Sequence, residues 1–190
     1  MRTLAVSCCV LALAGCVTTH PTAPARDWET RVQDLQKAGT WQLDGRAAVA
    51  VGTQGWQATL DWRERSGSAE LHLAGPLGVG AQVITQTAGG LAINGAPASE
   101  AALAQLQERL GFDLPIDNLR YWLLGVPDPR LEFELQRNEQ NRAQHLSQAG
   151  WSIDFDRYLS VAGDVLPGRV VLSRDQVRVR IVADHWKLGP

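Results

Sequence analysis

Cysteine and histidine are the side chains in this sequence best suited to catalysis or metal binding, and their spacing limits which of these sites they could form. The histidines lie far apart, from position 20 to position 185, and match no metal-ligand spacing. No Gly-x-Ser-x-Gly segment presents a nucleophilic serine. We therefore expect neither a metal nor an organic cofactor, and we expect no enzyme. A catalytic site assembled only by folding is the alternative.

The third cysteine, Cys16, stands in a setting that predicts a modification. Leu4 to Ala14 is apolar, which suits the core of a signal peptide and is shorter than the ~20 residues needed to span a bilayer. Leu13-Ala14-Gly15-Cys16 is similar to a bacterial lipobox, which implies cleavage before Cys16, diacylglycerol on its thiol and acylation of the new amino group. Ordinary secretion with a chance cysteine is the alternative.

Three segments follow from this interpretation. Residues 1–15 would be a cleaved lipoprotein signal peptide, which also removes Cys8 and Cys9 and leaves no possible internal disulfide. Residues 16–26 would be a lipidated N-terminus with a tether rich in proline and threonine. Residues 27–190 would form a single domain. With 18 basic and 20 acidic side chains and no basic patch, the chain is not expected to bind nucleic acid.

Alternation of apolar and polar residues dominates the chain from Thr40 onward. Runs such as 56–62, 131–136 and 177–183 have a period of two and are separated by turns rich in glycine and serine, which predicts an antiparallel sheet. Helical patterns cover 27–39, with Asp27 as N-cap, 99–111 and 116–127.

Three short helices give little cover to the apolar face of so long a sheet. We therefore predict a mainly β fold with helices (α+β): an open, unclosed antiparallel β half-barrel capped by short amphipathic helices around an apolar cavity. A packed core without a cavity is the alternative. The residues that alternation suggests for the cavity are Trp41, Trp56, Leu60, Trp62, Leu73, Val83, Leu106, Leu123, Trp151 and Phe155.

The turn Gly75-Pro76-Leu77-Gly78 presents a leucine where polar residues are usual. The order of residues predicts a type I turn, because proline suits the second position and leucine resists the positive φ that a type II turn needs at the third. Leu77 would then lie at the outer corner. Its side chain either projects from the molecule or folds back onto its own sheet.

The whole predicted mature chain resembles the LolB family of outer-membrane lipoprotein receptors. The resemblance rests on the order and spacing of several segments. These are the lipobox ending in Cys16, LDGRAAV (43–49), LDW (60–62), LAGPLG (73–78), YWLLGVP (121–127), QAGWSIDF (148–155) and VRVRIVADHW (177–186).

The resemblance implies a function and a place in the cell. Such receptors accept acylated lipoproteins from the periplasmic carrier LolA in Gram-negative bacteria. They insert them into the inner leaflet of the outer membrane without ATP. The absence of aspartate at Val17 implies an outer-membrane anchor facing the periplasm, and we expect a monomer that contacts LolA, cargo acyl chains and membrane lipid. A scaffold lipoprotein of an outer-membrane assembly complex is the alternative.

The resemblance also implies a role for the turn. In this family the leucine of the Pro-Leu-Gly turn protrudes and is needed to place lipoproteins in the membrane. The matching residue here is Leu77, flanked by Gly75, Pro76 and Gly78.

Overall fold

The computed structural model describes residues 27–189. The predicted signal peptide (1–15), the predicted lipidation site Cys16 and the predicted tether (16–26) lie outside the described residues. Within them, no helix is long and apolar enough to cross a membrane.

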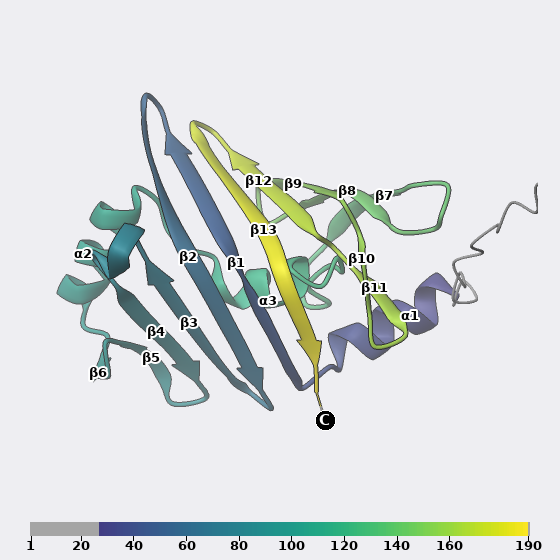
Figure 1. Cartoon of the computed structure of the whole chain (residues 1–190), viewed down its shortest axis with the longest axis horizontal. Coiled ribbons are helices and arrows are strands. Elements are labelled where there is room, and N and C mark those ends of the chain that lie inside the picture. Colours follow the sequence, from purple (N-terminus) through teal and green to yellow (C-terminus); the bar gives the residue numbers. More distant parts are fainter. Residues whose placement is uncertain (1–26, 190) are drawn as a thin grey trace, which may run out of the picture.

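The described chain forms three α-helices, one short 3₁₀ turn and thirteen strands (Figure 1). The helices are α1 (Trp28–Gln36), α2 (Glu100–Leu110) and α3 (Ile116–Trp122), and the 3₁₀ turn is η1 (Pro76–Gly78). The strands are β1 (Thr40–Val51), β2 (Gln54–Arg65), β3 (Ser68–Ala74), β4 (Gln82–Thr87), β5 (Gly90–Ile93), β6 (Ala96–Pro97), β7 (Phe133–Arg137), β8 (Ala143–Gln148), β9 (Trp151–Asp156), β10 (Leu159–Val161), β11 (Asp164–Leu166), β12 (Arg169–Arg174) and β13 (Val177–Leu188).

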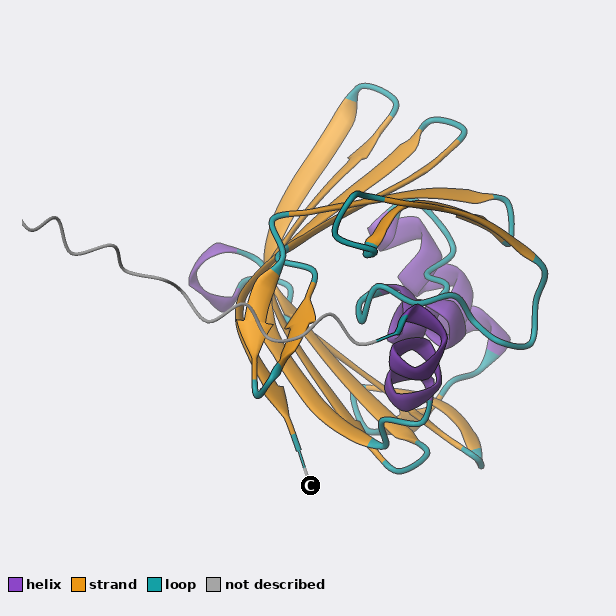
Figure 2. Ribbon diagram, turned by 90° about the vertical axis from the view of Figure 1, so that its right-hand side faces the viewer, coloured by secondary structure: helices purple, strands orange, loops and turns teal. Residues whose placement is uncertain are grey.

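Eleven of these strands form one antiparallel sheet in the order β6-β5-β4-β3-β2-β1-β13-β12-β9-β8-β7. The sheet curls around the helices without closing, because its end strands β6 and β7 do not pair (Figure 2). β1 at its centre is paired along its length with both β2 and β13. The predicted mainly β fold with an unclosed sheet and capping helices is confirmed.

One glycine is required for this central pairing. The register between β1 and β13 shifts between Asp44 and Gly45. A Cβ atom on Gly45 would lie 2.3 Å from the carbonyl oxygen of Val182, closer than any side chain allows. The bulge therefore depends on a residue without a side chain.

The apolar face of the sheet and the helices share a single core. Alternate residues of β1 and β2 are buried, among them Trp41, Leu43 and Trp62, and all three helices lie on the same side of the sheet (Figure 2). The Trp41 and Trp62 rings stack 5.8 Å apart at one end of this core. The outward-facing residues of these strands are mainly polar, as alternation predicts.

Two of the three helices begin at a side-chain cap, but the predicted extension of the first to Gly39 is wrong, because α1 ends at Gln36 with Lys37 as its C-cap. Asp27 accepts a hydrogen bond from Thr30 N at the start of α1, and Ser99 accepts one from Ala102 N at the start of α2. Gly111 ends α2 in the left-handed conformation. The third helix was predicted to reach residue 127, which is wrong: α3 ends at Trp122, and the following turn has Gly125 at φ 76°.

Several elements that follow α3 in the chain differ from the sequence prediction. β8 and the hairpin β10–β11 were not predicted, because their short runs mix polar and apolar residues. The apolar alternation over 131–136 suggested a buried face, yet Leu131 and Phe133 are exposed. β7 is the last strand of the sheet, so no further strand shields these side chains.

Candidate functional site

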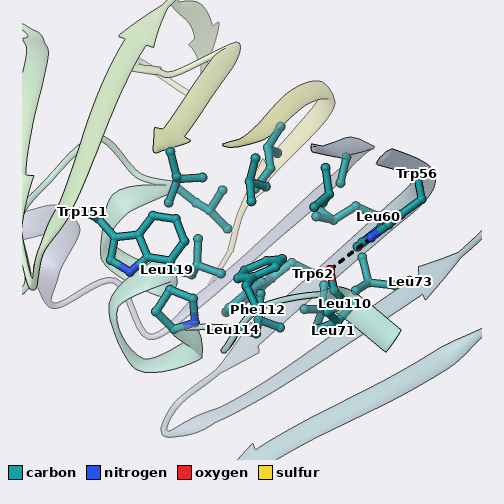
Figure 3. Close-up of a pocket in the computed structure, with 17 residues that line it drawn as sticks. Trp56, Leu60, Trp62, Leu71, Leu73, Leu110, Phe112, Leu114, Leu119 and Trp151 are labelled. Carbon is teal, nitrogen blue, oxygen red and sulfur yellow. Dashed lines mark hydrogen bonds between the residues drawn. The ribbon is translucent and has the colours of Figure 1, made fainter. Parts of the chain in front are cut away.

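A wholly apolar cavity lies between the concave face of the sheet and the helices (Figure 3). Its free space is about 30 Å³, enough for about two water molecules. The lining side chains come from β1–β3, β9, β12, β13, the end of α2, the segment between α2 and α3, and α3 with the residue just after it. They are Ala47, Val49, Trp56, Leu60, Trp62, Leu71, Leu73, Leu110, Phe112, Leu114, Pro115, Leu119, Leu123, Trp151, Leu172, Val179 and Ile181.

Six of the ten residues that alternation suggested lie around this cavity, and four do not. The six are Trp56, Leu60, Trp62, Leu73, Leu123 and Trp151. Trp56 is also fixed in place by its indole N–H, which donates to the Leu110 carbonyl at 3.2 Å. This bond ties the wall of the sheet to the end of α2 (Figure 3).

The other four residues do not line the cavity, for identifiable reasons. Val83 pairs with His72, whereas its neighbour Ile84 pairs with Leu71, so Val83 lies on the opposite face of the sheet. The predicted alternation was wrong there by one residue, because residues 79–81 form a turn and not the start of the strand. Trp41 and Phe155 are buried in the core away from the cavity, and Leu106 lines a separate groove on α2.

Among the eleven cavity residues that the sequence did not suggest, two groups are informative. Leu71, Val179 and Ile181 have the right alternation and were placed on the apolar strand face without being assigned to the cavity. Phe112, Leu114 and Pro115 lie in the connection between α2 and α3, which has no period. Only the tertiary structure brings that connection over the sheet.

A buried ion pair joins helix α3 to the sheet beside the cavity. Arg120 Nη2 lies 2.8 Å from Glu64 Oε1, and Trp62 Nε1 donates to Glu64 Oε2 at 3.3 Å. The Glu64 side chain is fully buried, whereas Arg120 remains partly exposed. Burial raises the pKa of Glu64, and the charge of Arg120 and the Trp62 N–H oppose part of that rise.

This pair makes a pH-dependent prediction. Because the pKa of Glu64 is raised on folding, its contribution to stability falls as the pH rises from the ordinary carboxyl range through the folded pKa. Arg120→Leu leaves a buried carboxylate unpaired and should lower the unfolding free energy by about 3 kcal/mol at pH 8 and by less at pH 5. Glu64→Gln should cost less than about 1 kcal/mol. Urea unfolding at both pH values checks this, and equal losses for Arg120→Leu at pH 5 and 8 would contradict it.

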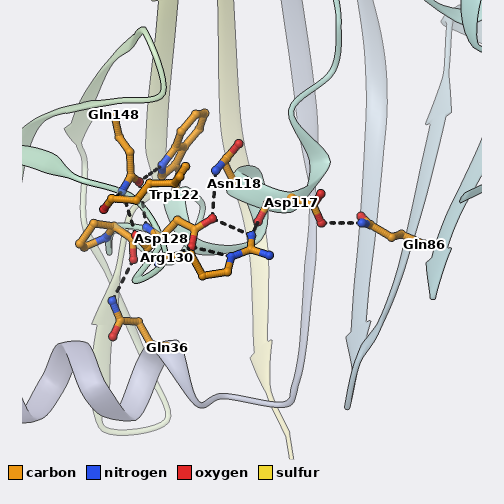
Figure 4. A network of polar contacts seen from close by, with 10 residues as sticks. Gln36, Gln86, Asp117, Asn118, Trp122, Asp128, Arg130 and Gln148 are labelled. Carbon is orange, nitrogen blue, oxygen red and sulfur yellow. Dashed lines mark hydrogen bonds and ion pairs between the residues drawn. The ribbon is translucent and has the colours of Figure 1, made fainter. Parts of the chain in front are cut away.

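A second polar network anchors the other side of α3 (Figure 4). The carboxamide of Gln148 accepts from Trp122 Nε1 and from Asp128 N, both at 2.8 Å. It donates to the carbonyls of Asp128 and Leu131. Asp128 is itself fully buried, and hydrogen bonds from Arg130 and Asn118 lower its pKa although burial alone would raise it.

Replacing this glutamine tests how firmly the helix is anchored. Gln148→Leu removes the partner of three buried polar groups and of the partly buried Leu131 carbonyl, and a buried group costs about 1–3 kcal/mol when left unpaired. We expect a loss of at least about 3 kcal/mol in unfolding free energy, measured by denaturant titration. Gln136→Leu, on the exposed outer face of β7, is the matched control and should be nearly neutral. Equal stability of the two variants would show that the network is dispensable.

The turn between β3 and β4 carries the most exposed large apolar side chain of the described chain. Leu77 is 103% exposed relative to a free side chain, and Val79 is 72% exposed. Gly78 N donates to the Gly75 carbonyl at 2.9 Å, and Gly75 N donates to the Val79 carbonyl at 3.0 Å. The leucine therefore projects from a closed loop and does not fold back onto the sheet.

The predicted type I turn is wrong in its backbone. Leu77 adopts φ 58° and ψ 24°, in the left-handed region, where a type I turn requires negative φ. Closure of the loop through Gly75 and Val79 forces this conformation. A left-handed non-glycine residue costs about 1–2 kcal/mol, so the turn holds an apolar side chain in water at the expense of backbone strain.

The described residues contain no group of three histidine, cysteine, aspartate or glutamate side chains that could hold a metal ion. The two histidines with ionic partners, His72 with Glu70 and His145 with Asp154, lie outside the cavity lining. The chemistry available at the cavity is therefore apolar binding.

Comparison with known proteins gives a consistent family match. Residues 39–186 match the family model described as outer membrane lipoprotein LolB. The chain is 34% identical to the outer-membrane lipoprotein LolB of Nitrosococcus oceani, covering 95% of this chain and 94% of the relative. It is 32% identical to the corresponding protein of Pseudomonas aeruginosa, covering 92% and 90%.

A solved structure is similar in fold. A LolA superfamily protein from Nitrosomonas europaea superimposes with a TM-score of 0.57 at 8% identity, covering 85% of this chain and 93% of that chain. This likeness concerns the curled sheet and its helices alone. The family match, by contrast, covers most of the chain. The chain therefore belongs to the LolB family of outer-membrane lipoproteins, which are non-enzymatic lipoprotein receptors.

Proposed function

We propose that this protein accepts acylated lipoproteins from the carrier LolA and inserts them, without ATP, into the inner leaflet of the outer membrane. The observation that carries the proposal is the pairing of a wholly apolar cavity with a fully exposed leucine on a strained turn. The cavity would hold acyl chains, and the turn would meet the bilayer.

The cavity walls suit an acyl chain by their chemistry. Every lining side chain is apolar, so a chain that enters leaves no polar group without a partner. Each methylene removed from water contributes about 0.8 kcal/mol. Since the free space is about 30 Å³, the walls must move apart when a chain enters. The element best able to do so is α2, because the strands are held by ladder hydrogen bonds and α3 is held by the contacts of Arg120 and Gln148.

The Leu77 turn supplies a brief membrane contact. Burying one leucine in lipid contributes about 1.5–3 kcal/mol, which biases an anchored domain toward the bilayer without fixing it there. Lipidation of Cys16 would provide the lasting anchor. The strength of this membrane contact should depend only weakly on the salt concentration, because the turn itself carries no charged residue.

Depletion of the protein in cells tests this function. Lipoproteins destined for the outer membrane should accumulate in the periplasm bound to the carrier, because no receptor removes them. Cell fractionation and isolation of the carrier with its cargo measure this. Normal arrival of lipoproteins, together with loss of an outer-membrane assembly complex, would instead indicate a scaffold.

A further inference from the structure

A second apolar depression lies on helix α2, separate from the cavity. We call it the α2 groove. It has a volume of about 380 Å³ and is lined by residues of α2, β5, the start of α3 and the connection between the two helices. Most of its lining side chains are apolar, among them Leu91, Leu103, Leu106, Leu110, Phe112 and Leu114, and Glu100, Gln107 and Asp113 also line it.

The α2 groove shares a wall with the cavity. Leu110, Phe112 and Leu114 line both spaces, so these three side chains belong to a shared wall. Leu110 is the last residue of α2, and Phe112 lies just beyond it. Gly111 between them is the C-cap of the helix and adopts the left-handed conformation. A modest movement of this apolar wall would join the two spaces into one.

We propose that the α2 groove is a second acyl-chain site, which receives a chain of a triacylated lipoprotein that the cavity does not hold. The inference rests on the proposed function. A cysteine processed at a lipobox carries three chains, whereas the cavity in this state has space for about two water molecules. The groove is larger and already open to solvent.

The exposed residue Leu103 supports an apolar occupant. It is 41% exposed, although it lies on the same side of α2 as the buried residues Leu106 and Leu110. Covering it with an apolar group would remove its surface from water, which is favourable. A linear acyl chain suits a groove lined by a row of leucines along one helix, and a protein partner is one of the outcomes of the test below.

The position of the groove also suits the delivery step. α2 ends next to the turn that carries Leu77: a Cβ atom placed on Gly80 would lie 4.0 Å from the Arg109 guanidinium. The groove runs along the same helix, up to Leu110. A chain passing from the cavity across the shared wall would therefore emerge beside the turn proposed to touch the membrane.

The test compares Leu103→Glu with Gln105→Glu in the chain from residue 17 onward, which retains every element described above. Both substitutions add one charge to an exposed position of α2, but only Leu103 lines the groove. The probes are a tripalmitoylated and a monopalmitoylated lipopeptide. We expect Leu103→Glu to weaken binding of the tripalmitoylated peptide about fivefold and to leave the other unchanged. Gln105→Glu should bind both like the parent chain.

Three outcomes would overturn the inference. Equal binding of the tripalmitoylated peptide by both variants would show that no chain occupies the groove. Equal losses for both peptides would indicate a general effect on the cavity. Leu103→Glu could also bind the tripalmitoylated peptide normally when the peptide is supplied in detergent micelles, but take up less of it from the carrier. That result would identify the groove as a carrier-docking surface. Failure of the parent chain to bind either lipopeptide would instead refute the proposed function itself.

A fluorescence measurement gives an independent readout. The chain from residue 17 onward has no cysteine, so Leu103→Cys and Gln105→Cys each accept one environment-sensitive dye. Loading with the tripalmitoylated peptide should shift the emission of the dye at position 103 to the blue and leave position 105 unchanged. No shift at position 103 in a loaded protein would contradict occupation of the groove.

Discussion

Leu77→Glu should still take lipoprotein from the carrier but deliver it to membranes at least about tenfold less well. The loss follows because the side chain that would enter lipid is replaced by a charge that is costly to bury there. Uptake is unaffected because Leu77 does not line the cavity. The measurement is the amount of lipoprotein in outer-membrane vesicles after incubation with loaded protein.

Two further variants separate the side chain from the backbone at this turn. Gln140→Glu adds the same charge to an exposed loop next to β7 and should deliver normally. Leu77→Gly relieves the left-handed strain, so it should leave the unfolding free energy unchanged or higher while delivery falls. Normal delivery by Leu77→Glu would remove the proposed role of the turn.

Cys16→Ala should abolish lipidation and release the protein from the outer-membrane fraction. Acyl chains anchor with about 0.8 kcal/mol for each buried methylene, and no other residue is proposed to carry them. Labelling with radioactive palmitate followed by fractionation measures both effects. Cys9→Ala lies in the predicted signal peptide and should leave labelling intact. Palmitate on the Cys16→Ala protein would disprove the lipobox.

The structural features that the sequence predicts correctly are those that depend on residues close together in the chain. Asp27 and Ser99 cap helices because their side chains reach amides three residues on. The faces of β1 and β2 follow from alternation, since both strands are long and half-buried. The same alternation brought Trp56, Leu60 and Trp62 to the cavity wall.

Other features depend on contacts that no local pattern contains. The left-handed backbone of Leu77 follows from loop closure by Gly75 and Val79, whereas residue preferences favoured a type I turn. Val83 was assigned to the wrong face because the strand begins after the turn. The ion pair between Glu64 and Arg120 joins β2 to α3, which lie far apart in the sequence. Neither the types of these residues nor their spacing predicts the pair.

The cavity lining shows the same division. Leucines on strands were placed on the apolar face correctly, but Phe112, Leu114 and Pro115 belong to a connection without periodicity. These residues complete the cavity because α2 and α3 are held over the sheet by Trp56, Arg120 and Gln148. The wall between the cavity and the α2 groove is thus visible only in three dimensions.

The most direct test of the central claim mixes the chain from residue 17 onward with a carrier loaded with an acylated lipoprotein, in the absence of ATP. Separation of the two proteins then shows which of them holds the lipoprotein. We predict that it moves to this protein, as a receptor with the stronger acyl-chain site requires. Retention of the lipoprotein on the carrier, with this protein folded throughout, would contradict the account.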